Sequence, residues 1–135
     1  SLIDLVAEAA EESLASEEPV ALMTGSATFR RATEFIEANL TDPMLNALSV
    51  ARACNVSVRA LHLAFQPTGT TVAAHIRESR LMGCRKDVCD PRWVHETVAN
   101  IALDWGFADP AHFSRLYKAR FGIAPSRERP GVAGS

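Results

Sequence analysis

The sequence predicts an all-α protein in which two helix-turn-helix subdomains are joined by a long central helix and preceded by an acidic N-terminal helix. Three observations lead to this prediction. A helix-turn-helix pattern occurs over residues 47–65 and again over residues 100–117. A longer helical segment at residues 71–88 separates the two copies. No segment of useful length alternates apolar and polar residues in the way that a half-buried β-strand does.

The two copies share a small residue followed by a turn residue. Ala51 precedes Asn55 by four residues, and Ala102 precedes Gly106 by the same number. The alanines allow two helices to cross closely, and asparagine and glycine tolerate the left-handed backbone that a tight turn requires. A short second helix braced in this way is how a helix is presented to the DNA major groove.

Length and composition narrow the class of protein. A chain of 135 residues is long enough for one or two small domains. No apolar run approaches the roughly 20 residues that a membrane span needs, and no secretory signal pattern is present. Three cysteines without regular spacing argue against a disulfide framework, so we expect a reducing cytoplasm.

The charge is divided unevenly along the chain, whose formal net charge is −2. Residues 1–25 carry six acidic side chains and no lysine or arginine. The remainder carries all 14 basic residues against 10 acidic ones (16 less 6), a balance of +4. This asymmetry fits an acidic appendage on a DNA-facing domain, although +4 is also ordinary for a soluble domain, so charge alone does not establish DNA binding.

Residues 1–25 are expected to form an acidic linker helix, the tail of an N-terminal sensor domain that this sequence does not include. Its apolar and acidic residues follow a helical period over residues 2–14. Glu17, Glu18 and Pro19 are expected to interrupt it, with a linker up to Gly25.

The first subdomain is assigned to residues 26–69. Its opening helix is expected from about Ala27 to Asn39, with Ser26 as a possible cap. Two helices follow near residues 47–54 and 57–66, the second capped by Ser57. The packing face of that second helix consists of Val56, Leu61, Ala64 and Phe65, and Cys54 is expected to be a small core residue.

The connecting helix is assigned to residues 70–90, and Asp90 and Pro91 close it. Its inward candidates are Val72, Ile76, Leu81 and Cys84, with His75 at the edge of the core. The second subdomain, residues 91–130, contains helices near 94–104 and 110–120, and residues 131–135 are expected to be a disordered tail.

In the second subdomain Asp109 is the expected N-cap, Pro110 occupies the first helical position, and Gly122 ends the helix. Its aromatic residues are expected to form a core rather than a cofactor site; they are Trp105, Phe107, Phe113, Tyr117 and Phe121, and Leu116 packs with them.

In each helix-turn-helix copy, the second helix has an outward face suited to contacting DNA bases. In the first, Arg59 and His62 project together. Arginine can bond guanine O6 and N7, and histidine can donate to a base or a phosphate. Leu63 has two possible roles, contact with a thymine methyl group or simple packing.

In the second copy, the outward candidates for base contact on this helix are Ala111, His112 and Arg115. Phosphates position a protein on DNA without reading sequence, and the candidates for that contact are Ser57, Ser114, Lys118, Arg120 and Arg127. A single arginine on a surface helix is usually a solvated charge, so the assignment depends on the double motif.

Other function classes have less support. Cys84, Cys89 and His95 lie five and six residues apart, which fits no zinc signature, and a fourth ligand is not evident. No nucleophile has an identifiable base partner and no glycine-rich phosphate loop is present, so we expect neither an enzyme nor a cofactor. Two alternatives stay open: a helical module that binds an acidic protein partner, and a thiol or metal sensor using Cys84 and Cys89.

The chain resembles the AraC/XylS family of bacterial transcription regulators over about residues 28–129. The stretch WGFADPAHFSRLYKARFGIAP at residues 105–125 resembles the family's C-terminal signature. VSVRAL at residues 56–61 adds to it, followed by Phe65, Gly69, Ile76-Arg77 and Arg80-Leu81. Leu63 replaces the arginine that the family commonly has, Asn55 replaces a glycine, and Tyr117 replaces a phenylalanine.

The resemblance implies a homeodomain-like pair of helix-turn-helix subdomains with recognition positions at Arg59, His62 and Leu63 and at Ala111, His112 and Arg115. It implies double-stranded DNA as the partner, with a non-palindromic site for each chain. It further implies an activator that meets RNA polymerase on the bacterial nucleoid in the cytoplasm, with an effector bound only by a separate N-terminal domain.

Overall fold

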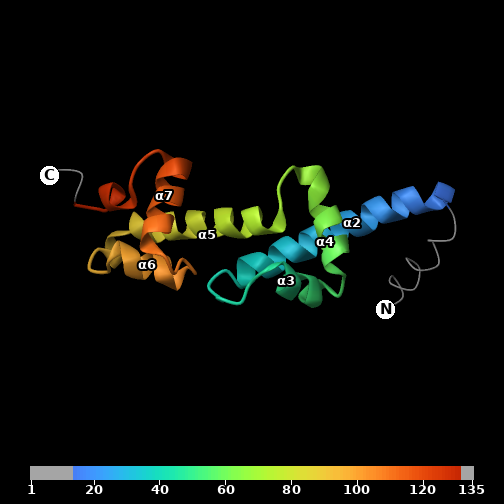
Figure 1. The fold of residues 1–135 in the computed structure, drawn as a ribbon, viewed down its shortest axis with the longest axis horizontal. Helices are drawn as coiled ribbons and strands as arrows, with labels where there is room; N and C mark the ends of the chain where they lie inside the picture. Colours follow the sequence, from blue (N-terminus) through green and yellow to red (C-terminus); the bar gives the residue numbers. More distant parts are fainter. Residues whose placement is uncertain (1–13, 132–135) are drawn as a thin grey trace. The chain divides into compact units, whose positions relative to one another are not determined.

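The computed structural model describes residues 14–131, with side chains from residue 25 onward (Figure 1). This part of the chain consists of α-helices and short 3-10 helices without a β-strand, which confirms the all-α prediction. It divides into two compact units, one containing residues 14–38 and 46–74 and the other residues 39–45 and 75–131. The predicted acidic helix at residues 2–14 and nearly all of the predicted tail at 131–135 lie outside the described residues.

The first unit contains α2 (Leu14–Ala38), α3 (Ala47–Cys54), α4 (Val58–Phe65), the 3-10 turn η1 (Gln66–Thr68) and the start of α5. The Asn46 side chain accepts a hydrogen bond from the Ser49 amide at 2.9 Å, and Ser49 Oγ accepts one from the Asn46 amide at 3.0 Å. Asn55 ends α3 in the left-handed conformation with φ 59°. Ser57 Oγ accepts from the Ala60 amide at 3.0 Å, so the predicted cap of α4 is confirmed.

The interruption expected at Glu17, Glu18 and Pro19 is wrong, because α2 runs without a break from Leu14 to Ala38. Ser26 therefore lies inside this helix and does not cap it. Pro19 falls within the first two turns, where it removes one backbone hydrogen bond and leaves every later residue free to be helical. The same helix packs against α3 and α4, and tertiary packing can override local propensity.

The core of the first unit forms where α2 meets α3 and α4, and Figure 1 shows α4 lying across α2. Phe29 packs edge-to-face on Phe65 with ring centroids 4.8 Å apart. The predicted inward position of Cys54 is confirmed, and Val56 is half-buried. The buried hydrophobic residues of this unit are Ala32, Ile36, Val50, Ala51, Cys54, Leu61, Ala64, Phe65 and Val72, and Thr28 is buried with them.

The second unit contains most of α5 (Val72–Val88), η2 (Pro91–Trp93), α6 (Val98–Asp104), α7 (Pro110–Phe121) and η3 (Pro125–Glu128). Helix α6 begins at Val98, later than the expected residue 94, because η2 takes up residues 91–93 and Thr97 provides the cap. Asp109 Oδ1 accepts from the amides of Ala111 at 3.0 Å and His112 at 3.2 Å, which confirms it as the N-cap of α7.

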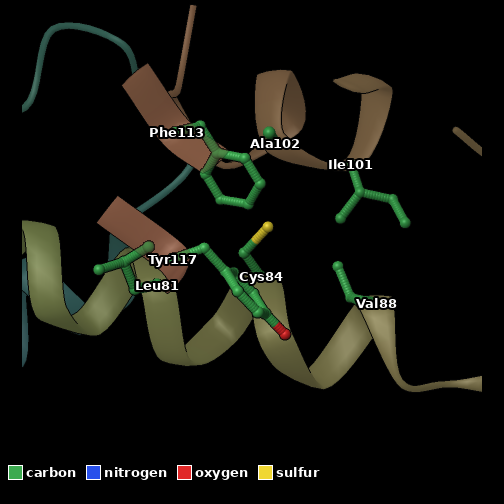
Figure 2. Close-up of a cluster of buried hydrophobic side chains, with 7 residues drawn as sticks. All are labelled: Leu81, Cys84, Val88, Ile101, Ala102, Phe113 and Tyr117. Carbon is green, nitrogen blue, oxygen red and sulfur yellow. The ribbon is translucent and has the colours of Figure 1, made fainter. Parts of the chain in front are cut away.

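Three helices contribute to the core of the second unit, which Figure 2 shows in close-up. Its buried members are Leu81, Cys84 and Val88 of α5, Ile101 and Ala102 of α6, and Phe113 and Tyr117 of α7. The half-buried residues packed against them are Val98, Trp105, Phe107, Leu116 and Phe121. The predicted aromatic set therefore forms a hydrophobic core, as expected.

Gly83 lies at the closest approach between α5 and the end of α6. A Cβ atom added to Gly83 would lie 2.5 Å from Cη2 of Trp105. The indole ring cannot move away freely, because its Nε1 donates a hydrogen bond to Asp87 Oδ2 at 2.8 Å. Glycine at residue 83 is therefore a requirement of packing.

We expect Gly83→Ala to lower the free energy of unfolding by about 1–3 kcal/mol, because the added methyl group displaces Trp105 from Asp87. Denaturant unfolding followed by circular dichroism measures the change. Gly25→Ala in α2 is the matched control: its Cβ meets no atom within 4 Å, and alanine favours the helix there by up to about 1 kcal/mol. Stabilisation by both substitutions would show that Trp105 is not held in place.

Candidate nucleic-acid interface

The outer face of α4 brings the first set of predicted site residues together. Arg59, His62 and Leu63 are all exposed, and with Val58 and Gln66 they line one shallow hollow on the helix. This follows from the helical period, which places residues three, four and seven positions apart on a single face. The buried residues of α4 lie on its other side, so this face is free to meet a ligand.

Gln66 is a member of this surface that the sequence did not single out. It is the last residue of the helix expected near residues 57–66, and Pro67 follows it. In the structure its backbone is still helical, with φ −54° and ψ −44°, so its side chain continues the face of Arg59. Glutamine can form two hydrogen bonds with adenine. The seven-residue spacing from Arg59 was the only sequence signal for it.

The outer face of α7 carries the second set of predicted site residues. Ala111, His112 and Arg115 are exposed, and they alternate with the buried Phe113 and Tyr117 along the helix. Ser114 and Lys118 are exposed as well. The arrangement gives α7 one face that packs and one that displays a histidine and two cations.

The two remaining phosphate candidates of the second unit differ in their surroundings. Arg120 Nε donates to both carboxylate oxygens of Glu78, at 2.9 and 2.8 Å, and its Nη2 lies 2.7 Å from Oε2. The guanidinium also stacks on the Phe121 ring, 5.1 Å from the centroid. A phosphate would have to compete with Glu78 for Arg120, whereas Arg127 is exposed in η3.

A polar network holds the inner face of α7 in place. The Tyr117 hydroxyl donates to Glu128 Oε1 at 2.5 Å. Arg85 donates to both oxygens of Glu128, at 3.2 and 3.1 Å, and stacks on Phe121 with 4.5 Å to the ring centroid. We call Arg85, Tyr117 and Glu128 the α7 anchor. Sequence reasoning missed Arg85 and Glu128, because they are 43 residues apart and neither belongs to a motif.

The α7 anchor shifts the pKa values of its members. Burial, followed by the hydrogen bond to Glu128, raises the pKa of Tyr117 above its usual value, so the hydroxyl stays a donor. Burial by itself would raise the pKa of Glu128, but hydrogen bonds from Tyr117 and Arg85 outweigh it and lower that pKa. The carboxylate is therefore charged at neutral pH.

Arg129 is a second basic residue with a structural role. It is almost fully buried, and its Nη2 donates to the carbonyl oxygens of Trp93 at 2.7 Å and of Glu96. These bonds tie the end of the chain to the segment that precedes α6. Arg129 is thus part of the support for this unit, and its burial removes it from the candidate interface.

The cysteines give no support to a metal or thiol site. Within residues 14–131 no group of three or more histidine, cysteine or acidic side chains is placed to hold a metal ion. Burial, with a smaller effect of Asp87, raises the pKa of Cys84 to about 12, so this thiol is protonated at neutral pH. Cys89 is exposed and Cys54 is buried.

None of the helices between residues 14 and 131 is long and apolar enough to cross a bilayer.

The comparisons with known proteins agree with the helix-turn-helix geometry. The family model described as a helix-turn-helix domain matches residues 50–130. The probable thc operon regulatory protein of Rhodococcus erythropolis is 37% identical over 100 residues, which is 73% of this chain and 30% of that protein. The transcriptional activator NphR of a Rhodococcus species is 31% identical over 135 residues, covering 96% of this chain and 37% of the relative.

A solved structure shares the fold. The transcriptional regulator from Chromobacterium violaceum, whose title describes AraC-type DNA-binding domain-containing proteins, superposes with a TM-score of 0.70 and 30% identity over 79% of this chain and 93% of that chain. The present chain spans only about a third of the length of the curated relatives it matches.

The α7 anchor predicts a pH-dependent contribution to stability. We expect Glu128→Gln to lower the free energy of unfolding at pH 7 by about 1–3 kcal/mol, because the hydrogen bonds to a charged group are lost. Since the folded pKa of Glu128 is lowered, its contribution is present above the unfolded value of about 4.3 and is lost as the pH falls through the folded value.

Denaturant unfolding of both proteins from pH 7 to pH 3 measures this contribution. The gap in unfolding free energy should close at the acidic end. Glu34→Gln, the same change at an exposed position of α2, is the control and should leave the free energy unchanged. A constant gap between the parent protein and Glu128→Gln over the whole pH range would contradict the account.

Proposed function

Because this chain belongs to the AraC/XylS family of helix-turn-helix transcription regulators, we propose that α4 and α7 are its recognition helices and that each enters a DNA major groove. The observation that carries this proposal is the exposure of Arg59 and His62 on α4 and of His112 and Arg115 on α7, each set opposite a buried face.

The chemistry of these side chains suits sequence-specific readout. Arg59 and Arg115 can each bond guanine O6 and N7, and the histidines can donate to a base or a phosphate. The two outer faces differ in composition, so one chain reads a non-palindromic site. On DNA we expect two sub-sites about one helical turn, roughly 34 Å, apart on the same side of the duplex.

Regulation of transcription by this protein would involve RNA polymerase and an effector in addition to DNA. NphR, which is similar to this chain, is named a transcriptional activator, so we propose RNA polymerase as a second partner. An effector would act through a separate N-terminal sensor domain. The protein would then work on the bacterial nucleoid in the cytoplasm.

The direct test is selection of binding sites from a random duplex pool, followed by fluorescence polarisation across a salt series. We expect one enriched asymmetric sequence and an affinity that falls steeply with salt, because phosphate neutralisation releases counterions. Failure to bind any duplex at low salt would refute the proposal and would favour a protein partner for the basic surface.

Arg115→Ala should weaken binding to the selected site by about 1–3 kcal/mol and relax the base preference at one position. Fluorescence polarisation at fixed salt measures the affinity, and repeated selection measures the preference. Arg92→Ala removes the same charge from η2, where Asp90 already holds the guanidinium, and should change affinity much less. Equal effects of the two substitutions would mean that Arg115 contributes only charge.

Lys118→Ala should weaken binding to all sequences alike and reduce the slope of log affinity against log salt by about one unit, as expected for one lost phosphate contact. Salt titrations on the selected site and on random DNA measure both effects. Lys86→Ala on α5 is the control, since Lys86 is the chain's other lysine and is also exposed. A loss confined to the selected site would mark Lys118 as a reader of bases.

A further inference from the structure

Leu63 is an apolar side chain on an otherwise polar reading face. Its side chain is 55% exposed, although Leu61, Ala64 and Phe65 of the same helix are buried in the core. Simple packing, one of its two possible roles, therefore does not account for it.

Leu63 lines two neighbouring hollows on the surface of the first unit. On one side it shares the shallow hollow of α4 with Arg59, His62 and Gln66. On the other it borders an apolar hollow of about 300 Å³ whose walls include Phe29, Ala64 and Pro67. Leu63 therefore has apolar neighbours on one side and the polar side chains of the α4 face on the other, which places its methyl groups beside the polar readers.

The major groove offers one apolar feature for such a side chain. Guanine, cytosine and adenine present hydrogen-bonding groups there, whereas thymine adds a C5-methyl group. Leucine has no donor or acceptor, so beside a polar base edge it would remove water without replacing the hydrogen bonds. Contact with a thymine methyl buries two apolar groups at once.

We propose that Leu63 recognises the C5-methyl group of a thymine in the first sub-site and so determines which base pair is preferred at that position. The inference rests on the proposed function, with α4 as a recognition helix. Leu63 follows Arg59 by one helical turn, about 5.4 Å, and the base-pair rise is about 3.4 Å. The thymine therefore lies within one or two base pairs of the base that Arg59 contacts.

Uracil provides the test, because it pairs as thymine does and lacks only the methyl group. Each thymine of the selected site is replaced by uracil in turn, and affinities are measured by fluorescence polarisation at fixed salt. For the parent protein we expect one position near the Arg59 contact at which uracil weakens binding about fourfold, the effect of burying one methyl group.

Leu63→Ala should bind the thymine and uracil sites with equal affinity, whereas Leu63→Met, which keeps an apolar side chain, should retain a preference for thymine. Leu103→Ala is the matched control: Leu103 is 58% exposed, lies on α6, and should leave the discrimination unchanged. Thermal unfolding by circular dichroism checks that all variants are folded.

The possible failures are distinguishable. Binding of every uracil site as tightly as the thymine site, persistence of the preference in Leu63→Ala, or a selected first sub-site without thymine would overturn the role of Leu63 and leave DNA binding intact. Absence of binding to any duplex at low salt would overturn the proposed function and this inference with it.

Discussion

The α7 anchor is the constraint on which the second unit depends. Glu128 accepts hydrogen bonds from Tyr117 on α7 and from Arg85 on α5, and so links α7 to α5. A carboxylate that is largely removed from water, as that of Glu128 is, is tolerated where such partners replace its water. Because Tyr117 must point inward to reach Glu128, the rotation of α7 about its axis is fixed. His112 and Arg115, on the other face, are exposed as a consequence.

In the first unit, apolar packing fixes the orientation of the corresponding helix, α4. Helix α4 is oriented by Leu61, Ala64 and Phe65, and Phe65 meets Phe29 of α2 edge-to-face. Apolar packing is less directional than a hydrogen-bond network, so shape has to select the orientation. Small residues at the crossing, such as Ala32 and Ala51, let the helices approach closely enough for this, since both are fully buried.

Local features of this fold could be predicted from the sequence, and long-range ones could not. Asn55 and Asp109 were predicted as turn and cap because their chemistry acts within three residues, and the structure confirms both. The pairs Arg85–Glu128 and Glu78–Arg120 join residues more than 40 positions apart, where no periodicity applies. The continuity of α2 through Pro19 was missed because Glu17, Glu18 and Pro19 together indicate a break, whereas a proline near the start of a helix removes only one backbone hydrogen bond.

The two outer faces show how fold and recognition are separated in this chain. Neither Leu63 nor Arg115 contributes to the core, so the free energy of folding places little restriction on either position. The buried faces determine that two helices are presented, whereas the exposed faces determine what each helix can contact. Each face carries an arginine and a histidine, but the α4 face adds the large apolar side chain of Leu63, whereas the α7 face adds Lys118, so the two exposed surfaces of one polypeptide are unlike. If both faces contact DNA as proposed, this difference leads us to expect an asymmetric site, because two identical half-sites would not match two unlike surfaces.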